Sequence, residues 1–269
     1  MSHWSRKKIA EALKGIYRKI GHSPSAREVE PVLYQASRKC FGSFNKAKKS
    51  LGLKTTLLKH HQINKKAKIL REDLAYIFGV IEGDGYCRKR KNTKRTSGEI
   101  ILKVKDKDFA EEFANRLKRW SGVNPKYWEK DGEFFTALYS VDAVDVIKKI
   151  RLRELIISNK KVKSNFLKGM YDSEGGVIGT NLNRRKFACR WIHFSNNNEK
   201  LVKTVNRILN DLGIPHKIKS RIHSGFGSKK LQYEVLIFGL ENFKKFYKNI
   251  GFSIKRKQNK LLEVIESYG

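Results

Sequence analysis

The sequence predicts an α+β protein whose larger part consists of two similar halves, preceded by a small all-helical domain. Three observations support this fold class. Residues 77–85 and 167–175, which begin 90 residues apart, share the residue type at their third, sixth, seventh, eighth and last positions. Each of the two stretches precedes segments with the alternating apolar and polar pattern of strands joined as hairpins. Short helical patterns separated by glycines occupy the first 53 residues, before either half begins.

The composition is strongly basic. The 269 residues include 59 lysines and arginines against 26 acids, a formal net charge of +33. This charge indicates a polyanionic partner, with nucleic acid as the first candidate. We expect no membrane association, because no apolar run approaches the ~18 residues of a spanning helix. We also expect an intracellular protein, cytoplasmic in a prokaryotic host or organellar, because no secretion signal opens the chain.

The first domain is expected to span residues 1–53 and to contain three short helices. Apolar residues recur at helical spacing from Trp4 to Ile20, and a second helix is predicted from Ala26 to Lys39, although Pro31 favours a later start. A third helix is predicted over 45–51. Three short helices with tight turns are typical of a helix-turn-helix-like module. Residues 54–71 form a basic linker in this interpretation, with no assigned role for the histidines at 60 and 61.

The two matching stretches are predicted to be buried helices, the first from about Glu72 to Gly83 and the second ending at Gly175. Each has Gly in third place, an acid in sixth, a small residue in seventh, an acid in eighth and Gly last. Small residues four apart lie on one helical face, where they allow two backbones to approach closely. We therefore expect the two helices to pack against each other through Gly79, Gly83, Gly169 and Ser173.

The eighth-position acids, Asp84 and Glu174, then meet at the ends of the two helices. A helix C-terminus is negative, and two neighbouring carboxylates raise each other's pKa. A divalent cation relieves both problems, and Mg²⁺ favours carboxylates together with water and phosphate. The sequence therefore predicts a Mg²⁺ site, which Mn²⁺ would also fit, at Asp84, Glu174, Gly83 and Ser173. The sixth-position acids face elsewhere on their helices, so we expect them to be structural.

Each half is predicted to continue with two hairpins and further helices. In the first half, 72–160, the elements are strands 86–91 and 99–105, helix 106–120, strands 126–128 and 134–140, and helix 141–150, with residues 151–163 connecting the halves. In the second half, 161–269, they are strands 177–181 and 187–195, helix 198–212, strands 216–223 and 231–238, and closing helices 241–250 and 254–268. The histidines in or beside these strands, among them His193, are expected to be half-buried and structural.

The paired motifs and the repeated αββαββα order resemble those of the monomeric LAGLIDADG homing endonucleases with two motifs. Residues 1–53 resemble the homing endonuclease associated repeat, through the segments 21–25, 41–47 and 51–53. The resemblance implies two antiparallel saddles arching over DNA, with the motif helices at the centre. It also implies a monomer that binds double-stranded DNA with a long asymmetric target site.

The resemblance places DNA-binding residues on the hairpins, since a two-stranded ribbon fits the major groove. The expected residues are Arg88, Lys89, Arg90, Lys91, Lys94, Arg95, Lys103, Arg184, Arg185, Lys186, Arg190 and Arg221. In the family, a polar and a basic residue at the end of the second strand of each repeat assist the catalytic water. Alignment puts Val104 and Lys105 there in the first half, and Ser195 and Asn196 in the second. Val104 and Asn196 depart from the usual residue types, which puts equal cleavage of the two strands in doubt.

These residues predict a reaction class. Two carboxylates, a divalent cation and a basic saddle suit hydrolysis of a phosphodiester by metal-activated water. The leading hypothesis is a site-specific double-strand DNA endonuclease with Asp84, Glu174, Lys105 and Asn196 as catalytic residues. The alternative is an intron RNA splicing maturase or a non-cleaving DNA-binding regulator on the same scaffold. Cleavage of insertion-site DNA and binding of intron RNA would discriminate between them.

Overall fold

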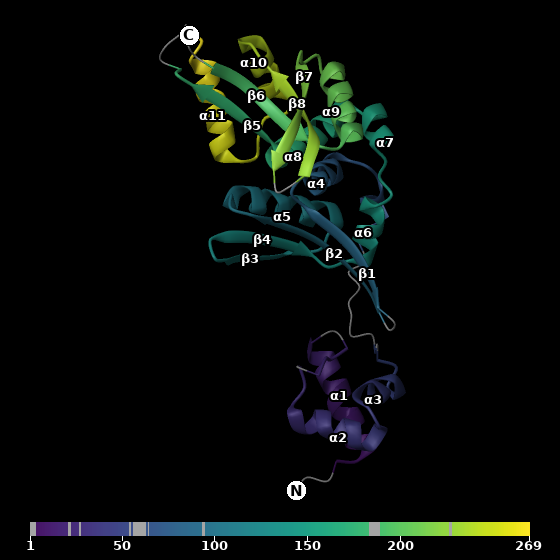
Figure 1. Ribbon diagram of the computed structural model, residues 1–269. Helices are drawn as coiled ribbons and strands as arrows, with labels where there is room; N and C mark the ends of the chain where they lie inside the picture. Colours follow the sequence, from purple (N-terminus) through teal and green to yellow (C-terminus); the bar gives the residue numbers. More distant parts are fainter. Residues whose placement is uncertain are drawn as a thin grey trace. The chain divides into compact units, whose positions relative to one another are not determined.

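The computed structural model describes residues 4–20, 23–26, 28–53, 55, 63, 65–92, 95–182, 189–225 and 228–269. The chain divides into two compact units, Met1–Lys59 and His60–Gly269, and Figure 1 follows both along the sequence. Each unit has its own cluster of buried apolar side chains.

The first unit consists of three helices, α1 (Arg6–Ile20), α2 (Pro31–Phe41) and α3 (Phe44–Ser50). They pack around Ile9, Leu13 and Ala47, all fully buried. Helix α2 begins five residues later than the expected Ala26, because Pro31 suits the first turn of a helix, where its missing N–H removes no hydrogen bond.

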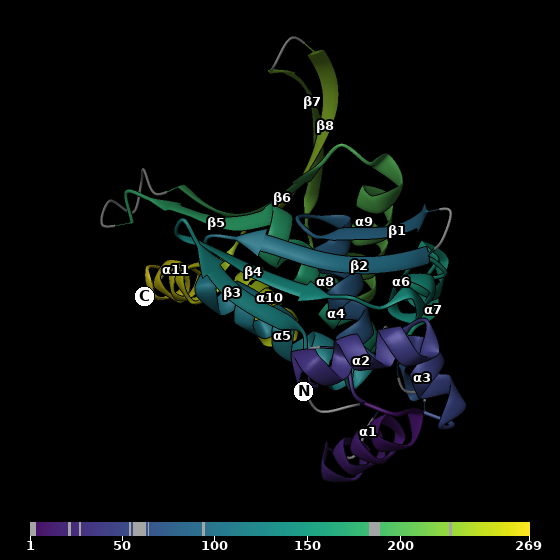
Figure 2. The ribbon, with the colours of Figure 1, turned by 90° about the horizontal axis from the view of Figure 1, so that it is seen from below.

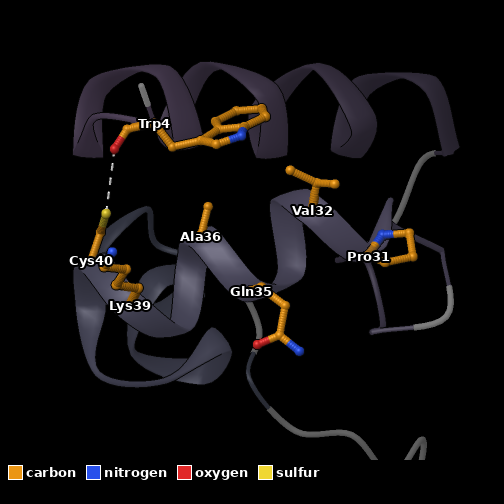
Figure 3. A pocket seen from close by; sticks show the side chains of 7 residues that line it. All are labelled: Trp4, Pro31, Val32, Gln35, Ala36, Lys39 and Cys40. Atoms are coloured by element: carbon orange, nitrogen blue, oxygen red, sulfur yellow. Dashed lines mark hydrogen bonds between the residues drawn. The ribbon is translucent and has the colours of Figure 1, made fainter. Parts of the chain in front are cut away.

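One side of this first unit is hollowed between the segment before α1 and helix α2. Figure 3 shows Trp4, Val32 and Ala36 around a hollow of about 760 Å³. Cys40 donates its Sγ hydrogen to the carbonyl oxygen of Trp4 at 3.5 Å, which fixes the start of the chain over α2. Val32 remains 59% exposed, and Gln35 and Lys39 add polar groups to the lining of the hollow.

The second unit contains two antiparallel four-stranded sheets. The first sheet has the strand order β1-β2-β4-β3 and the second has β5-β6-β8-β7. The first-sheet strands are β1 (Tyr86–Asn92), β2 (Arg95–Val104), β3 (Lys126–Lys130) and β4 (Glu133–Leu138). The second-sheet strands are β5 (Gly175–Thr180), β6 (Cys189–Asn196), β7 (Lys217–Gly225) and β8 (Ser228–Ile237). The hairpin of β7 and β8 extends beyond the rest of its sheet (Figure 2). The predicted fold class is thereby confirmed.

Helices accompany both sheets. They are η1 (Lys65–Lys68), α4 (Glu72–Glu82), α5 (Lys107–Ser121), α6 (Val141–Ile147), α7 (Leu152–Ile157), α8 (Lys160–Glu174), α9 (Glu199–Asp211), α10 (Leu240–Asn249) and α11 (Lys255–Glu266). The connection expected between the halves thus contains α7 and the start of α8.

Each sheet has one face covered by helices and one open face. In the first sheet, the buried Thr136 donates its hydroxyl to the carbonyl oxygen of Ala110 in α5, which marks the covered face. In the second sheet, Gly179 lies so close to α11 that an added Cβ would sit 2.4 Å from Val264. Successive side chains alternate between faces along a strand. The neighbours of Thr136 and Gly179 in their strands therefore belong to the open faces.

The segment expected to be a linker partly belongs to the second unit. Ile63 and Ala67 are buried in the core of that unit. Trp120 of α5 also donates its indole N–H to the carbonyl oxygen of Ala67 at 2.7 Å. A linker between the units therefore ends before Ile63, and removing residues 1–70 would remove part of the second core.

Helices α4 and α8 cross with their backbones in close approach. A Cβ added at Gly79 would lie 2.4 Å from the carbonyl oxygen of Phe166, and one at Gly169 would lie 2.3 Å from that of Tyr76. Real Cβ atoms do not come this close to backbone oxygens, so the crossing requires glycine at both positions. The two glycines therefore set the distance between the halves.

We predict that Gly79→Ala or Gly169→Ala destabilises the second unit by at least the ~1–3 kcal/mol typical of overpacking, because a single methyl group would push the backbones apart. Thermal unfolding followed by circular dichroism measures the effect. The control is Gly15→Ala in α1, where an added Cβ meets nothing within 4 Å. That substitution is expected to stabilise its helix by roughly 0.5–1 kcal/mol. Melts unchanged by both crossing substitutions would contradict the close approach.

Candidate active site at the ends of the two motif helices

The C-terminal ends of α4 and α8 lie side by side. A Cβ added at Gly83 would be 2.5 Å from the Cβ of Ser173 and 3.2 Å from the Cγ of Glu174. Asp84 follows Gly83 directly, and the N–H of Gly85 donates to the carbonyl oxygen of Val80 at 2.8 Å, which closes the turn. The structure therefore brings together Asp84 and Glu174, as the sequence predicted for the metal site.

The two carboxyl groups are held in an unfavourable environment. Burial raises the pKa of both, and the negative charge of Asp84 raises the pKa of Glu174 further. In the described part of the chain, the buried hydroxyl of Ser173 has no hydrogen-bond partner. Among the described residues, no group of three His, Cys, Asp or Glu side chains comes together. Two carboxylates and an unpartnered hydroxyl fit a hard, oxygen-seeking cation such as Mg²⁺, which takes its other ligands from water and phosphate.

Lys257, in the first turn of α11, also belongs to the site, although it is not among the metal-binding or catalytic residues expected from the sequence. Its ammonium group donates to the carbonyl oxygens of Tyr171, Asp172 and Gly175 at 3.2, 2.5 and 2.7 Å. Burial lowers the pKa of Lys257, and the charge of Asp172 opposes that shift. A cation at this place balances the negative end of α8. The sequence offered one signal, a basic run at the start of a predicted helix, which is more often exposed.

Asp172, the sixth-position acid of the second motif, is structural. Its side chain is 1% exposed. It accepts hydrogen bonds from the hydroxyl of Tyr76 at 2.9 Å and from the N–H of Ser253 at 2.9 Å. Asp172 therefore ties α4 and α8 to the segment that precedes α11.

Two hollows flank the start of α11. The first, of about 280 Å³, is lined by Asp84, Lys105 and Ser173 among others, and the second, of about 530 Å³, by Gly176 and His193. Arg256 and Lys257 line both. Arg256 donates to both carboxylate oxygens of Asp106, at 2.6 and 2.7 Å, which lowers the pKa of Asp106.

The strand register corrects one expected equivalence between the halves. Tyr86 pairs with Ile101, and Gly176, its counterpart after the second motif, pairs with His193. Counting on from these pairs, Val104 corresponds to Asn196 rather than to Ser195. A shift by one residue moves a side chain to the other face of the sheet.

Asn196 therefore lies on the covered side of β6. Its Oδ1 accepts a hydrogen bond from the N–H of Asn198 at 2.8 Å, and it lines neither hollow. Lys105 does line the first hollow. The second hollow is lined by Lys260 and by His193, whose pKa is lowered by burial and by the charge of Lys257. The two hollows are chemically unequal.

The expected DNA-binding residues divide by strand face. Arg88, Arg90, Lys103 and Arg221 are exposed on the open faces, where the last three pair with Glu99, Glu133 and Glu234 respectively. By contrast, Lys89 points to the covered side and pairs with Asp145 of α6 at 2.7 Å. Arg190 also points to that side, where it donates to Ser267 and lies over the ring of Tyr268 at 4.4 Å.

The remaining expected DNA-binding residues cannot be placed on either face. Lys94, Arg184, Arg185 and Lys186 lie outside the described residues, as do the side chains of Lys91 and Arg95.

We predict that Lys257→Met lowers the free energy of unfolding by about 1.5–3 kcal/mol, the range for hydrogen bonds to a charged group, because three carbonyl oxygens lose their donor. Urea denaturation in the absence of metal measures this loss. The matched control is Lys260→Met, one turn further along α11, whose ammonium pairs with the exposed carboxylate of Glu263 at 2.9 Å. Equal, small effects of the two substitutions would show that Lys257 does not stabilise the end of α8.

Comparison with known proteins places these features in a family. The model of the LAGLIDADG-like domain matches the chain twice, over residues 71–164 and 161–251. An uncharacterized protein of Methanocaldococcus jannaschii, MJ0314, is 30% identical over 168 residues, which make up 58% of this chain and 61% of MJ0314. The chain thus spans about three fifths of the length of that relative.

Solved structures of the homing endonuclease I-DmoI share the fold. In its complex with DNA and Ca, I-DmoI is 18% identical, with a TM-score of 0.53 over 74% of this chain and 100% of that chain. In its complex with DNA and Mn, the values are 22% and 0.50, over 66% and 96% of the two chains. No helix in the described part of the chain is long and apolar enough to cross a membrane.

Proposed function

Because the chain belongs to the LAGLIDADG-like domain family, we propose that it is a site-specific double-strand DNA endonuclease with a divalent metal at the ends of its two motif helices. The observation that carries this proposal is the convergence of Asp84 and Glu174 on one place. Burial raises the pKa of both carboxyl groups, and the charge of Asp84 raises the pKa of Glu174 further, so the pair is costly to keep together. A bound cation would offset that cost, and the same cation could assist phosphodiester hydrolysis.

The chain's own residues fit this chemistry. Asp84 and Glu174 would hold Mg²⁺, with Mn²⁺ as a substitute, and the unpartnered hydroxyl of Ser173 lies beside them. A bound metal would polarise the scissile phosphate and lower the pKa of the attacking water. Lys105 carries positive charge into the first hollow, where a phosphate of one strand would lie. The second hollow is lined instead by His193 and Lys260 and by no carboxylate among the described residues. We therefore propose that the two DNA strands are cut at different rates.

The open faces supply the surface for DNA. Arg88 and Arg90 of β1, Lys103 of β2 and Arg221 of β7 are exposed there, and cations on a ribbon can reach both phosphates and base edges. Both halves of the site belong to one chain, so we propose that the protein acts as a monomer on an asymmetric target.

Asp84→Asn or Glu174→Gln is predicted to reduce cleavage by at least ~10²-fold, as for loss of a preorganised electrostatic group, because the metal loses a ligand. DNA binding should persist. The substrate is a site recovered from a randomised duplex library by binding in EDTA, and cleavage is then started with Mg²⁺. The control variant is Glu111→Gln on the exposed side of α5, whose carboxylate is 3.9 Å from Lys107. Full activity of either variant would overturn the metal site, and binding without cleavage by the wild type would favour a regulator.

We also propose that residues 1–53 form an accessory DNA-binding domain. Residues 1–55 carry 13 lysines and arginines against three acids, a net charge of +10. A tethered second contact raises the effective concentration of the first. If about three to five of these charges reach phosphates, their removal makes the slope of log affinity against log salt shallower by roughly 3–4.

Deleting residues 1–55 is therefore predicted to weaken DNA binding and to make it less salt-dependent, with unchanged cut positions. The comparison is a deletion of residues 1–70, which should in addition lower the melting temperature because Ile63 and Ala67 are buried in the second core. Footprinting and salt titration of the shorter deletion provide the readout. An unchanged salt slope and footprint would show that the first domain does not engage DNA.

A further inference from the structure

An aromatic patch lies on the open face of the first sheet, beside Lys103, which also lines the first hollow. Trp128 of β3 and Phe135 of β4 are directly paired across the strands. Their rings are stacked with centroids 5.1 Å apart and planes 7° from parallel. Both side chains are half-buried, so part of each ring meets solvent. We call Trp128 and Phe135 the aromatic pair.

The strand register fixes the face to which the aromatic pair belongs. Thr136, the next residue of β4, donates to Ala110 of α5 and marks the covered face. Because side chains alternate along a strand, Phe135 and its partner Trp128 point to the open face. Phe135 also pairs with Lys103 of β2, an expected DNA-binding residue.

Lysines surround the aromatic pair. The ammonium of Lys103 lies over the ring of Phe135 at 5.6 Å and pairs with Glu133 at 2.6 Å. Lys126, two residues before Trp128 on the same face, lies over the ring of Tyr139 at 5.4 Å. An apolar centre with a cationic rim suits a ligand that offers an apolar group beside negative charge. Duplex DNA offers this at a thymine, whose methyl group projects into the major groove between phosphates.

At the equivalent positions of the second sheet, the described residues form no such patch. The register identifies equivalent positions in the two sheets. In the first sheet, Ala137 of β4 pairs with Ile101 on one side and with Lys126 on the other. In the second sheet, Leu236 of β8 pairs in the same way with His193 and with Lys217. Two residues further on, the counterparts of Trp128 and Phe135 are Lys219 and Glu234, which are directly paired with each other. One half of the saddle therefore presents rings where the other presents a charged pair.

We propose that the aromatic pair reads the 5-methyl group of a thymine in the half-site bound by the first sheet. This inference rests on the proposed DNA-binding function and adds a specificity determinant to it. The rings bury a methyl group favourably, whereas the polar edge of a G·C pair would lose its hydrogen bonds to water against them. The equivalent position of the other half-site, facing Lys219 and Glu234, has no such preference.

Substitution of single thymines by deoxyuridine removes only the methyl group and tests this directly. The affinity of the full-length wild-type protein for a selected duplex is measured in EDTA. We expect deoxyuridine at one thymine position of the half-site bound by the first sheet to lower this affinity about three- to tenfold, on the scale of one buried methyl group. At the same position, a duplex with 5-methylcytosine should bind more tightly than a duplex with cytosine. A wild-type protein indifferent to every methyl group would overturn the inference.

Variants assign the effect to the aromatic pair. Trp128→Thr and Phe135→Thr keep strand-forming residues and should each bind the thymine and deoxyuridine duplexes equally. Lys219→Thr is the matched control in the second sheet and should retain the wild-type discrimination. Discrimination that persists in both aromatic variants would overturn the inference while leaving DNA cleavage untouched. Failure to recover any bound duplex would instead refute the proposed function itself.

Discussion

The close crossing of α4 and α8 is the constraint on which the rest of the second unit depends. Each helix admits the other's backbone at a glycine, Gly79 in one and Gly169 in the other. The crossing joins the two sheets into one body and decides where the helix ends lie. Asp84 and Glu174 approach each other because the backbones do, so the same small residues that allow packing also create the candidate metal site.

This arrangement concentrates negative charge. Two helix C-termini and two carboxyl groups converge, and a buried cation, Lys257, binds the carbonyl oxygens at the end of α8. Lys257 balances the backbone of the second motif but leaves the carboxyl groups with raised pKa values. A divalent cation would offset the remaining negative charge, and it could at the same time bind a DNA phosphate.

The motif helices, both sheets and the convergence of the two acids could be predicted from the sequence because glycine spacing and strand alternation have short-range physical causes. Errors arose where one residue of register decides a face. Asn196, Lys89 and Arg190 were assigned by their place in a segment, but strand alternation turns them toward the helices. The burial of Lys257 and Ile63 was not predicted, because it depends on elements distant in the sequence.

We propose above that Asp84 and Glu174 together hold a divalent cation against DNA. Anomalous diffraction from crystals of the protein with a selected duplex and Mn²⁺ tests this role of the two acids. We predict anomalous density between the ends of α4 and α8, within coordination distance of both carboxylates and a phosphate oxygen, and its loss in crystals of Asp84→Asn. Ordered DNA on the open faces with no metal at these helix ends would contradict the account.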